Sequence, residues 1–384
     1  MKKTHVFKLV KEYRKDPGGF SITYKRTAPN NRLADPATEH ILTELAREKE
    51  LIENPIIPLR YYNYSYVQRI LADTYHEKIS LPAIIAAAKK HGFYLPKRER
   101  KIHEREVSTH YAGELLQHDS SCHLFAPYAG EKWYLITTLD DFSRMILFAQ
   151  LVKKETSWAH IAAFQHVCLT FGIPFSYYVD NHSIFRFVQG RDSRWRKHSL
   201  TTDDVDTQWR QVLRDIRVQV TYALSPQAKG KIERPYRWFQ DRLVRTCARE
   251  GITKIEDAQQ VLGQETHRYN YHQVHSTTRE IPIILFERAL KNKQSLFREF
   301  ALPHPFTSLK DIFCFRLKRT VDSYRSISLN NVQLRVHQVP LRQEVDLRIA
   351  PSEDPDTYEL RIWYSGTLTD AYRIKRSDLK GVHF

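Results

Sequence analysis

The chain has 384 residues, which is too long for one ordinary domain and fits about two to four compact units. Lys and Arg outnumber Asp and Glu by 60 to 44, which gives a net charge of +16. This charge favours a protein that binds a polyanion over a basic but otherwise ordinary enzyme. No stretch approaches the roughly 20 apolar residues that cross a bilayer, and no apolar segment of a secretory signal follows the N-terminus. The four cysteines are far apart, which argues against a disulfide framework or a zinc knuckle. These features predict a cytoplasmic protein with no membrane partner.

The N-terminal part of the chain divides into two segments of different composition. Residues 1–36 are mixed and basic and predict an extended arm. From 37 to 92 apolar residues recur with helical spacing, and three helices are expected. The first ends before Pro55, and the second covers Tyr66 to Tyr75.

The third of these helices has clear start and stop signals. Ser80 is expected to cap it, and Gly92 stands just past its end. Lys89 and Lys90 lie at its exposed end. Two short helices joined by a tight turn in a basic chain predict a helix-turn-helix that contacts DNA, and a helical hairpin that only packs is the alternative.

The middle of the chain has the order of a mixed α/β domain. Residues 93–112 are charged, lack an apolar period and predict a basic linker near DNA. Over 113–300 strands come first, and strands and helices then alternate. The expected elements are strands at Tyr134–Leu139 and Met145–Val152 around a turn at Asp140–Arg144, a helix at Trp158–Phe171 and a strand at Phe175–Val179.

The last segment, 307–384, changes to a period of two. Apolar and polar residues alternate in short runs that end at turn-forming residues, as from Val332 to Val336, Val345 to Ile349 and Tyr358 to Ile362. This pattern predicts a small antiparallel β-barrel.

Two aspartates occupy positions that suit a cleft at a sheet edge. Asp119 lies on the expected first strand of the α/β domain, and Asp180 follows the apolar run that ends at Val179. An acid at the exit of a buried strand is well placed to face a ligand. For each residue alone, a turn or helix-cap aspartate is the stronger interpretation.

Glu233 is placed by helix geometry. Ile232, Tyr236, Phe239, Leu243 and Cys247 recur at spacings of three and four and predict one apolar helix face. Glu233 lies about 100° from Ile232, at the border of that face. The same segment is rich in cations that could hold a phosphodiester backbone, namely Lys229, Lys231, Arg234 and Arg237. An ordinary surface helix with a salt-bridged glutamate is the alternative.

Three carboxylates suit the transfer of a phosphoryl group. Two Mg²⁺ ions about 3.5–4 Å apart can stabilise both the entering and the leaving oxygen of an in-line displacement. Mg²⁺ prefers hard oxygen ligands and retains waters, so two or three Asp or Glu side chains suffice.

Four ordered blocks of sequence resemble the integrase catalytic core. They are Gln117–Ser121, Leu139–Arg144, Tyr178–Phe185 and Ser225–Arg234, and Tyr269–His272, His275–Ser276 and Pro282 resemble the segment that follows that core. The chain resembles bacterial insertion-sequence transposases of the ISNCY group and, more distantly, retroviral integrases. Together the blocks cover roughly residues 113–290 and are specific in combination.

The resemblance implies a fold, a site and an activity. It implies an RNase H-like α/β core in which Asp119, Asp180 and Glu233 form a DDE triad that binds two Mg²⁺ or Mn²⁺ ions. The N-terminal helix-turn-helix and the C-terminal SH3-like barrel would flank this core. The implied activity is 3′-end cleavage and strand transfer on double-stranded DNA by a homo-oligomer, a dimer or larger. The resemblance also implies a bacterial cytoplasmic protein that is nucleoid-associated when bound to DNA.

Four positions or segments depart from the family pattern or compete with the triad. Gln240 stands where relatives often carry Lys or Arg, and Arg237 is expected to take over the DNA contact. An insertion at about 186–210 is expected either to contact DNA or a second subunit, or to form a solvated basic loop. Asp140 and Asp141 are expected to cap their turn and orient Arg144 rather than bind metal. His118 is expected to pack behind the ligands.

Three functions remain open at this point. An active transposase is the leading hypothesis because the triad is intact. A truncated or domesticated DNA-binding protein without transposition activity is the alternative, which Gln240 and the short N-terminal region leave open. A nuclease that only cleaves is disfavoured by the barrel and the basic linkers, since a hydrolase has less need to hold several DNA segments.

Overall fold

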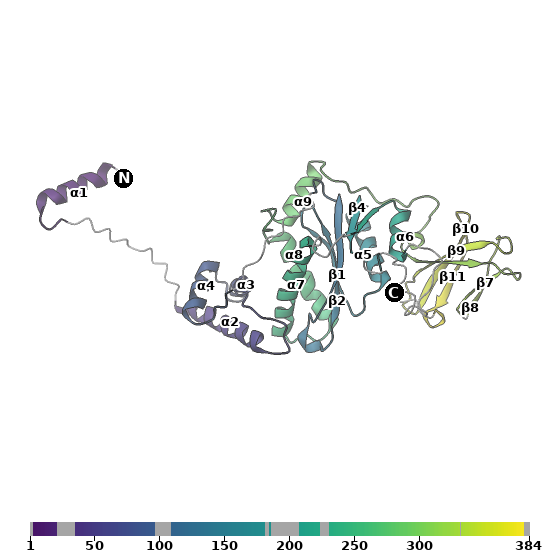
Figure 1. The fold of residues 1–384 in the computed structure, drawn as a ribbon, viewed down its shortest axis with the longest axis horizontal. Helices are drawn as coiled ribbons and strands as arrows, with labels where there is room; N and C mark the ends of the chain where they lie inside the picture. Colours follow the sequence, from purple (N-terminus) through teal and green to yellow (C-terminus); the bar gives the residue numbers. More distant parts are fainter. Residues whose placement is uncertain are drawn as a thin grey trace. The chain divides into compact units, whose positions relative to one another are not determined.

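The computed structural model describes residues 3–20, 35–96, 109–180, 184–185, 207–222, 230–330 and 332–379. Side chains are described over these ranges except at 3–5 and 230–234. The chain divides into two compact units, one formed by residues up to Lys49 and by Tyr62–Leu95, the other by Glu50–Tyr61 and the residues from Pro96 onward. Figure 1 shows the elements named below.

The N-terminal unit is helical. It contains α1 (Lys3–Lys15), α2 (Asp35–Glu53, whose last turn belongs to the second unit), α3 (Tyr64–Tyr75) and α4 (Leu81–Lys90). The extended arm predicted for residues 1–36 is therefore wrong over Lys3–Lys15, which form a helix. Val6, Val10 and Tyr13 recur there at spacings of four and three, which is a helical period that the many cations obscure.

The two helices of the predicted helix-turn-helix are present, and their DNA contact stays a prediction. Asn63 caps α3, its side chain accepting a hydrogen bond from the Tyr66 N–H. Ser80 is the N-cap residue of α4, but its side chain makes no capping hydrogen bond, so that detail of the prediction is wrong. Gly92 has the expected positive φ of 79° just beyond the helix.

Residues 50–61 lie outside the helical unit that the sequence assigns to 37–92. Leu51, Ile57 and Leu59 form an apolar cluster with Val244 and Ala248 of α7. In addition, the Arg245 guanidinium donates to the Tyr61 carbonyl at 2.5 Å. The segment thus packs on the second unit although it follows a helix of the first.

The second unit is built on a five-stranded sheet. Its strands are β1 (Leu115–His123), β2 (Trp133–Asp140), β3 (Ile146–Val152), β4 (Ser176–Val179) and β5 (Gln219–Tyr222), in the order β3-β2-β1-β4-β5. β1, β2 and β3 pair in antiparallel fashion, whereas β4 and β5 run parallel to β1. This mixed sheet resembles the RNase H-like core that the motifs imply. The predicted strands at 134–139, 145–152 and 175–179 are confirmed within one residue at each end.

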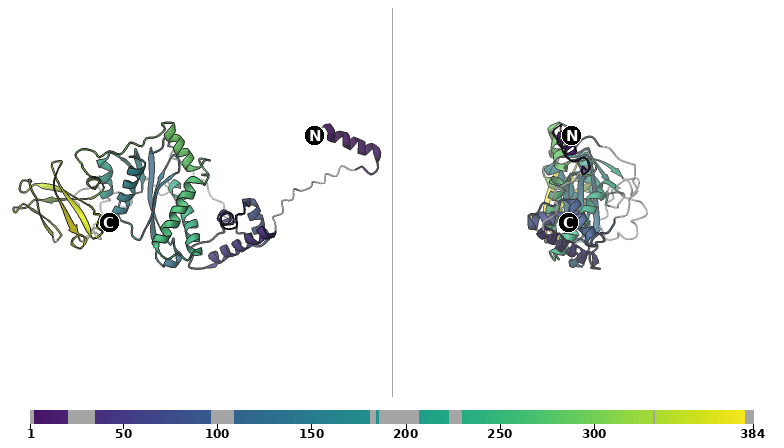
Figure 2. Two further views of the ribbon diagram at one scale, coloured as in Figure 1. Left: turned by 180° about the vertical axis from the view of Figure 1, so that it is seen from behind. Right: turned by 90° about the vertical axis from the view of Figure 1, so that its left-hand side faces the viewer.

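Helices cover both faces of this sheet. α5 (Ser157–Thr170) and α6 (Gln208–Asp215) lie on one face, where Phe164 and Trp209 pack with Tyr177 of β4. α7 (Gly230–Arg249) and α8 (Ile255–Tyr271) lie on the other, where Phe239 and Leu262 pack with β2 and β3. Figure 1 and the reverse view in Figure 2 show these two layers, and α9 (Pro282–Lys291) follows α8.

The last residues of the insertion predicted at 186–210 belong to α6 and its N-cap. Residues 186–206 lie outside the described residues. Thr207 caps α6, and Trp209 is fully buried against His118 and Tyr177, so the last residues of the range belong to the core. The predicted linker likewise ends early, because Ala112 already bridges to Ser295.

The C-terminal residues form two antiparallel sheets. After α10 (Leu309–Ile312), β6 (Phe315–Thr320), β9 (Glu344–Pro351), β10 (Thr357–Tyr364) and β11 (Thr367–Lys375) form a sheet in the order β11-β10-β9-β6, and β7 (Ser326–Leu329) pairs with β8 (Val332–Arg335). The predicted alternation is confirmed, since Val345, Leu347 and Ile349 of β9 are buried. The SH3-like barrel stays a prediction, because the ladders among the described strands do not close into a ring.

None of the described helices is both long and apolar enough to span a membrane. The four cysteines are free, and three of them, Cys168, Cys247 and Cys314, are buried.

Candidate active site

Asp119 lies on β1, and Asp180 directly follows the neighbouring strand β4. Gln117 of β1 pairs with Tyr178 of β4 in a parallel register. Side chains alternate between the faces of a strand, so the aspartates two residues further along come level with each other on one face. Both residues are half-buried. The strand register therefore brings together two carboxylates that are remote in sequence.

Tyr236 of α7 faces these carboxylates from the helical layer. Its side chain is buried, and its hydroxyl faces Thr137, the β2 residue that pairs with Asp119. Burial raises the pKa of the Tyr236 phenol well above its usual value, and the negative charges of Asp119, Glu155 and Asp180 raise it further. The phenol is thus protonated at neutral pH, in a region of concentrated negative potential.

Glu233 lies on α7, three residues before Tyr236. Residues three apart on a helix share one side, so the backbone carries Glu233 toward the side that faces β1. Its side chain lies outside the described residues, as do those of Lys231 and Arg234. The predicted apolar face is confirmed at Tyr236 and at three further buried residues, Phe239, Leu243 and Cys247.

The oxygen donors at this face fit a hard divalent cation. Carboxylates are the ligands that Mg²⁺ prefers, and two of them meet here. Within the described residues, groups of three or more His, Cys, Asp or Glu with metal-binding geometry are absent. Glu233 stays the predicted third carboxylate. No histidine or cysteine cluster competes for the same position in that part of the chain.

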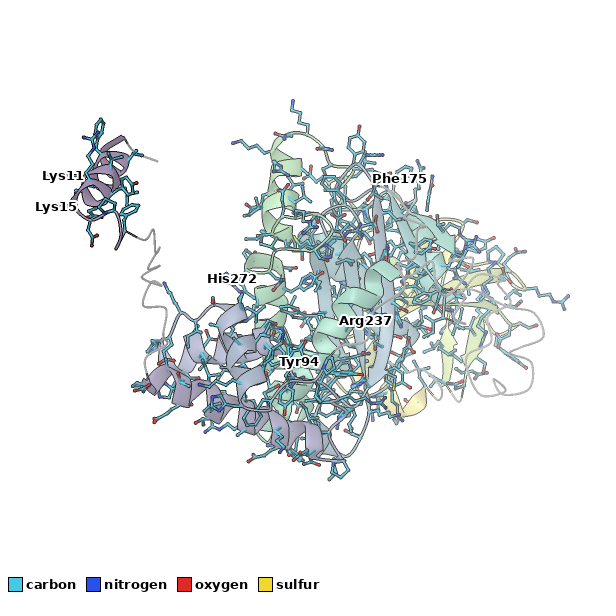
Figure 3. The ribbon with its side chains drawn as sticks, turned by 60° about the vertical axis from the view of Figure 1, so that its left-hand side comes forward. Lys11, Lys15, Tyr94, Phe175, Arg237 and His272 are labelled. Atoms are coloured by element: carbon cyan, nitrogen blue, oxygen red, sulfur yellow. The ribbon has the colours of Figure 1, made fainter. Side chains whose placement is uncertain are left out.

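Gln240 joins α7 to the strand that carries Asp119. Its side-chain amide donates to the Ser121 hydroxyl at 3.0 Å. Arg237, one turn earlier, is exposed on α7, as Figure 3 shows. Gln240 thus has a structural contact, while Arg237 keeps a charge at the surface. Lys229, the remaining predicted DNA contact in this segment, lies outside the described residues.

A buried chain of polar groups lies on the opposite face of β1. The Ser120 hydroxyl donates to Glu155 Oε1 at 2.5 Å, and the same oxygen is 3.0 Å from His160 Nε2. His160 Nδ1 lies 2.8 Å from His118 Nε2, and His118 Nδ1 lies 2.8 Å from the Thr138 hydroxyl. His118 and His160 are both buried, as expected for a residue that packs behind the site.

The carboxylate fixes the direction of these hydrogen bonds. A carboxylate can only accept, so His160 Nε2 carries a proton and donates to Glu155. With both imidazoles neutral, His118 donates to His160, and Thr138 donates to His118. Sequence reasoning missed Glu155. The only local signal is an acidic residue directly before the helix N-cap Thr156.

Asp140 and Asp141 hold the turn between β2 and β3, as predicted. Asp140 accepts from the N–H and hydroxyl of Ser143 at 2.9 and 2.6 Å and from the Gly113 N–H at 2.9 Å. Asp141 accepts from the Arg144 guanidinium at 3.0 Å and thereby fixes a residue whose φ is 67°. Burial raises the pKa of Asp140 to about 6. Asp140 is the last residue of β2 and pairs with Leu116, and Asp141 follows it, so both carboxylates lie near the other end of β1 from Ser121.

Lys89 and Lys90 are exposed at the C-terminal end of α4. The Lys89 ammonium lies 4.8 Å from the centre of the Tyr94 ring. The predicted cations of the helix-turn-helix are therefore at the surface, and their contact with DNA stays a prediction.

Two curated relatives share part of the chain's sequence, whereas no family model matches it. The Sinorhizobium fredii protein named "Putative transposase y4bF" is 29% identical over 180 residues, which are 47% of this chain and 38% of that protein. The Streptococcus pneumoniae "Transposase for insertion sequence IS1202" is 27% identical over 233 residues, which are 60% of this chain and 44% of that protein. The matched region thus spans less than half the length of either relative.

Retroviral integrases are among the similar solved structures. The HTLV-2 integrase catalytic core domain in complex with magnesium aligns with 15% identity over 46% of this chain and 97% of that chain, with a TM-score of 0.35. The simian T-cell lymphotropic virus intasome in complex with PP2A regulatory subunit B56 gamma aligns with 13% identity over 91% of this chain and 99% of that chain, with a TM-score of 0.38. These TM-scores are low, and the fold assignment rests on strand order and direction. The resemblance to bacterial insertion-sequence transposases that the motifs predict is confirmed by the named relatives.

Proposed function

We propose that the chain is a transposase that cleaves 3′ ends of DNA and transfers them to another DNA, with Asp119, Asp180 and Glu233 as its metal-binding carboxylates. The observation that carries the proposal is the parallel register of β1 and β4, which sets two of these carboxylates side by side. The position of Glu233 on the helix that covers the same face supports the third. The transposase names of the relatives support the class of reaction.

Each residue of the site has a defined task in this proposal. Two bound Mg²⁺ or Mn²⁺ ions would stabilise charge on the entering and leaving oxygens of the phosphodiester. Asp119 and Asp180 supply hard oxygen ligands from a rigid sheet, which fixes their separation. Burial and the charge of Asp119 raise the pKa of Tyr236, so its phenol stays protonated, lines the site as an uncharged group and does not act as a base. Arg237 and the cations near Glu233 hold the DNA backbone.

The other parts of the chain are proposed to hold DNA and subunits in place. The helix-turn-helix of α3 and α4 would read the element ends through Lys89 and Lys90. The C-terminal strands would hold DNA or a second subunit, within a homo-oligomer that pairs two ends. A DNA-binding protein without transposition activity is the second candidate. The specific observation in its favour is Gln240, which donates to Ser121 where relatives often carry a cation.

The test is metal-dependent nicking and strand joining on supercoiled plasmid. The purified chain is incubated with Mg²⁺ or Mn²⁺ and compared with Asp119→Asn, Asp180→Asn and Glu233→Gln. Each variant should lose activity by orders of magnitude and still bind DNA, because a neutral amide is a poor Mg²⁺ ligand. Glu250→Gln is the matched control, since this exposed acid directly follows α7.

The outcomes separate the two candidates. Activity that needs the triad and survives in the control supports the transposase. If the wild type is inert on plasmid and on DNA carrying the element ends but binds DNA as the variants do, the binding protein is the better account. Equal activity in the wild type and the triad variants would remove these carboxylates from the site.

A further inference from the structure

The Lys89 ammonium lies over an aromatic ring at the end of α4. Lys89 Nζ is 4.8 Å from the centre of the Tyr94 ring, within the reach of about 6 Å of a cation–π interaction. Both side chains are exposed, and that of Tyr94, which Figure 3 labels, is 40% exposed. An ammonium group has three N–H donors, so one that faces a ring has donors left for a ligand in solution.

The end of α4 turns the chain so that Tyr94 returns to the helix. Gly92 has a φ of 79°, and the N–H of Phe93 donates to the Ala88 carbonyl at 2.8 Å. This hydrogen bond closes the helix as a Schellman motif and reverses the direction of the chain. The residue after Phe93 therefore comes beside the last turn of α4, which carries Lys89.

Tyr94 is held in turn by a stack of tyrosine rings. The ring centres of Tyr62 and Tyr64 are 6.0 Å apart with 15° between the planes, and those of Tyr64 and Tyr94 are 6.3 Å apart with 12°. Tyr62 is buried, and the Tyr64 hydroxyl donates to the Phe93 carbonyl at 3.0 Å. Offset, nearly parallel rings at such separations attract one another. The Tyr62–Tyr64–Tyr94 stack thus connects an exposed ring to the interior of the helical unit.

Lys90 offers an internal comparison with Lys89. Both lysines are exposed in the last turn of α4, where the helix dipole favours a positive charge. Lys90 lies about 100° further around the helix, away from the direction in which Lys89 meets Tyr94. The two residues therefore share charge, helix and exposure, and they differ in the ring that supports one of them.

A supported lysine binds a phosphate at a lower entropic cost. A free lysine side chain loses rotamer freedom when its ammonium is fixed on a ligand. A contact that exists before binding removes part of that loss, which is how preorganisation raises affinity. The ring leaves the charge of the lysine unchanged. It should therefore affect how tightly DNA is bound and not how many phosphates are neutralised.

We propose that Tyr94 is a positioning residue for DNA binding. The Tyr62–Tyr64–Tyr94 stack holds the ammonium of Lys89 at the surface, and Lys89 binds a phosphate of the DNA that the helix-turn-helix contacts. The inference rests on the proposed function, because it takes DNA as the ligand of α4. It adds a role for an aromatic residue outside the helix, and it makes the two lysines unequal.

The test is a double-mutant cycle on DNA binding without metal. A short fluorescein-labelled duplex is titrated with the full chain in EDTA, and affinity is followed by anisotropy from about 50 to about 200 mM salt. Tyr94→Leu should weaken binding by about 2–5-fold, the size of an exposed cation–π interaction, without changing the slope of log K against log salt. In a Lys89→Ala background the same substitution should change nothing, because the residue that Tyr94 positions is gone.

Matched variants separate the ring from the hydroxyl and Lys89 from Lys90. Tyr94→Phe keeps the ring and should bind DNA as the wild type does. Tyr94→Met is a second ring-free variant, whose flexible side chain disturbs the packing less. Lys89→Ala alone should lower the slope by about 0.9, the share of one phosphate contact. In a Lys90→Ala background Tyr94→Leu should still weaken binding by the same factor. Thermal unfolding of each variant checks that the fold persists.

The outcomes also separate this inference from the function on which it rests. An equal loss on Tyr94→Leu with and without Lys89 would mean that Tyr94 meets DNA itself or supports the whole unit, and it would overturn the positioning role. Binding by Tyr94→Leu that equals the wild type would overturn it too, as would a Tyr94→Phe variant that binds as weakly as Tyr94→Leu.

The single substitution of Lys89 tests the premise of the inference. An unchanged slope in Lys89→Ala would remove Lys89 from the DNA and the positioning role with it, while metal-dependent nicking of plasmid would still support the transposase. If the wild type binds no DNA at any salt, both proposals are wrong.

Discussion

Glu155 accepts two hydrogen bonds at the end of the polar chain, and Glu155→Ala removes this acceptor. One oxygen of this carboxylate accepts from the Ser120 hydroxyl at 2.5 Å and lies 3.0 Å from His160 Nε2. The His160 side chain is 0% exposed and that of Glu155 is 12% exposed, so water replaces the carboxylate poorly. The substitution therefore leaves the half-buried Ser120 hydroxyl and the buried His160 N–H without this acceptor.

The expected loss of stability follows from these two donors. A buried donor left without an acceptor costs about 1–3 kcal/mol. Partial access of water on the Glu155 side favours the lower half of that range, so Glu155→Ala should lower the free energy of unfolding by about 2–4 kcal/mol. Glu155→Gln keeps an oxygen acceptor in place and should cost less than about 1 kcal/mol.

Urea unfolding followed by tryptophan fluorescence measures this difference. The Ala variant should shift the midpoint without changing the dependence on denaturant, because the folded surface is the same. Ser120 is adjacent to Asp119, so a loosened strand should also raise the Mg²⁺ concentration needed for half-maximal nicking, by about 10-fold or more. A purely structural role would leave that concentration unchanged in the molecules that remain folded. Equal stability of the Ala and Gln variants would refute the hydrogen-bond reasoning.

Three further predictions concern stability. At Gly172, where φ is 103°, an added Cβ would lie 2.6 Å from a backbone carbonyl oxygen, so Gly172→Ala should lower the free energy of unfolding by at least about 2 kcal/mol. Gly263→Ala, in open space on α8, is the control and should raise it by about 0.5–1 kcal/mol in the same urea assay. Asn270 makes two hydrogen bonds with the main chain of Ile146, at 2.8 and 2.9 Å. Asn270→Ala should therefore lower the free energy of unfolding by about 2–4 kcal/mol, and a change under about 0.5 kcal/mol would contradict this account. Because the folded pKa of Asp140, about 6, lies above the unfolded value of 3.8, its contribution to stability is full well below pH 3.8 and is lost as pH rises through 6. Relative to Asp140→Asn, the wild type should lose about 2.4 kcal/mol between pH 4 and 7, and parallel stability curves would contradict the raised pKa.

The parts of the site that sequence reasoning could place depend on local patterns. Asp180 follows an apolar run, Asp119 lies on the first expected strand of the α/β domain, and the face of α7 repeats every three or four residues, so these positions can be located without coordinates. The register that sets the two aspartates level is a tertiary property. It becomes visible only when β4 pairs with β1.

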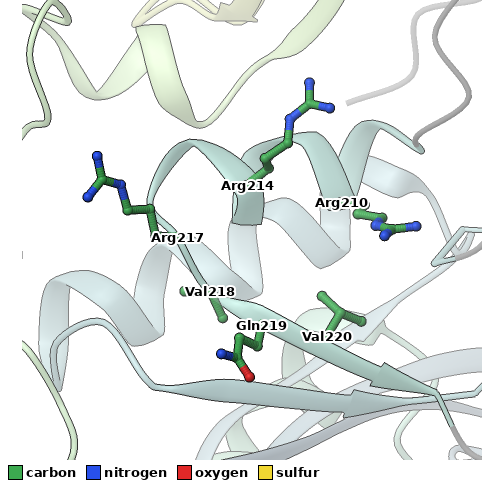
Figure 4. Close-up of a pocket in the computed structure, with 6 residues that line it drawn as sticks. All are labelled: Arg210, Arg214, Arg217, Val218, Gln219 and Val220. Carbon is green, nitrogen blue, oxygen red and sulfur yellow. The ribbon is translucent and has the colours of Figure 1, made fainter.

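Features made by long-range packing could not be predicted. His118 lies 42 residues before His160, and although Glu155 is only five residues before His160, nothing local marks the three as hydrogen-bonded to one another. The pocket that Arg210, Arg214 and Val220 help to line forms only where α6 meets β5 (Figure 4), and the sequence assigned the start of α6 to an insertion. Residues 50–61 follow a helix of one unit yet pack on the other because their apolar side chains meet α7.

The two faces of β1 explain how one strand can carry both the reactive groups and their support. Asp119 faces α7, while its neighbours His118 and Ser120 face α5 and enter the buried polar chain. A slip of β1 by one residue would exchange these faces and bring His118 to the position of Asp119. The same slip would leave His160 and Glu155 without their partners in the interior, at a cost of about 1–3 kcal/mol for each group. The polar chain on one face therefore fixes the register that holds the carboxylate on the other, although none of its members would touch DNA or metal.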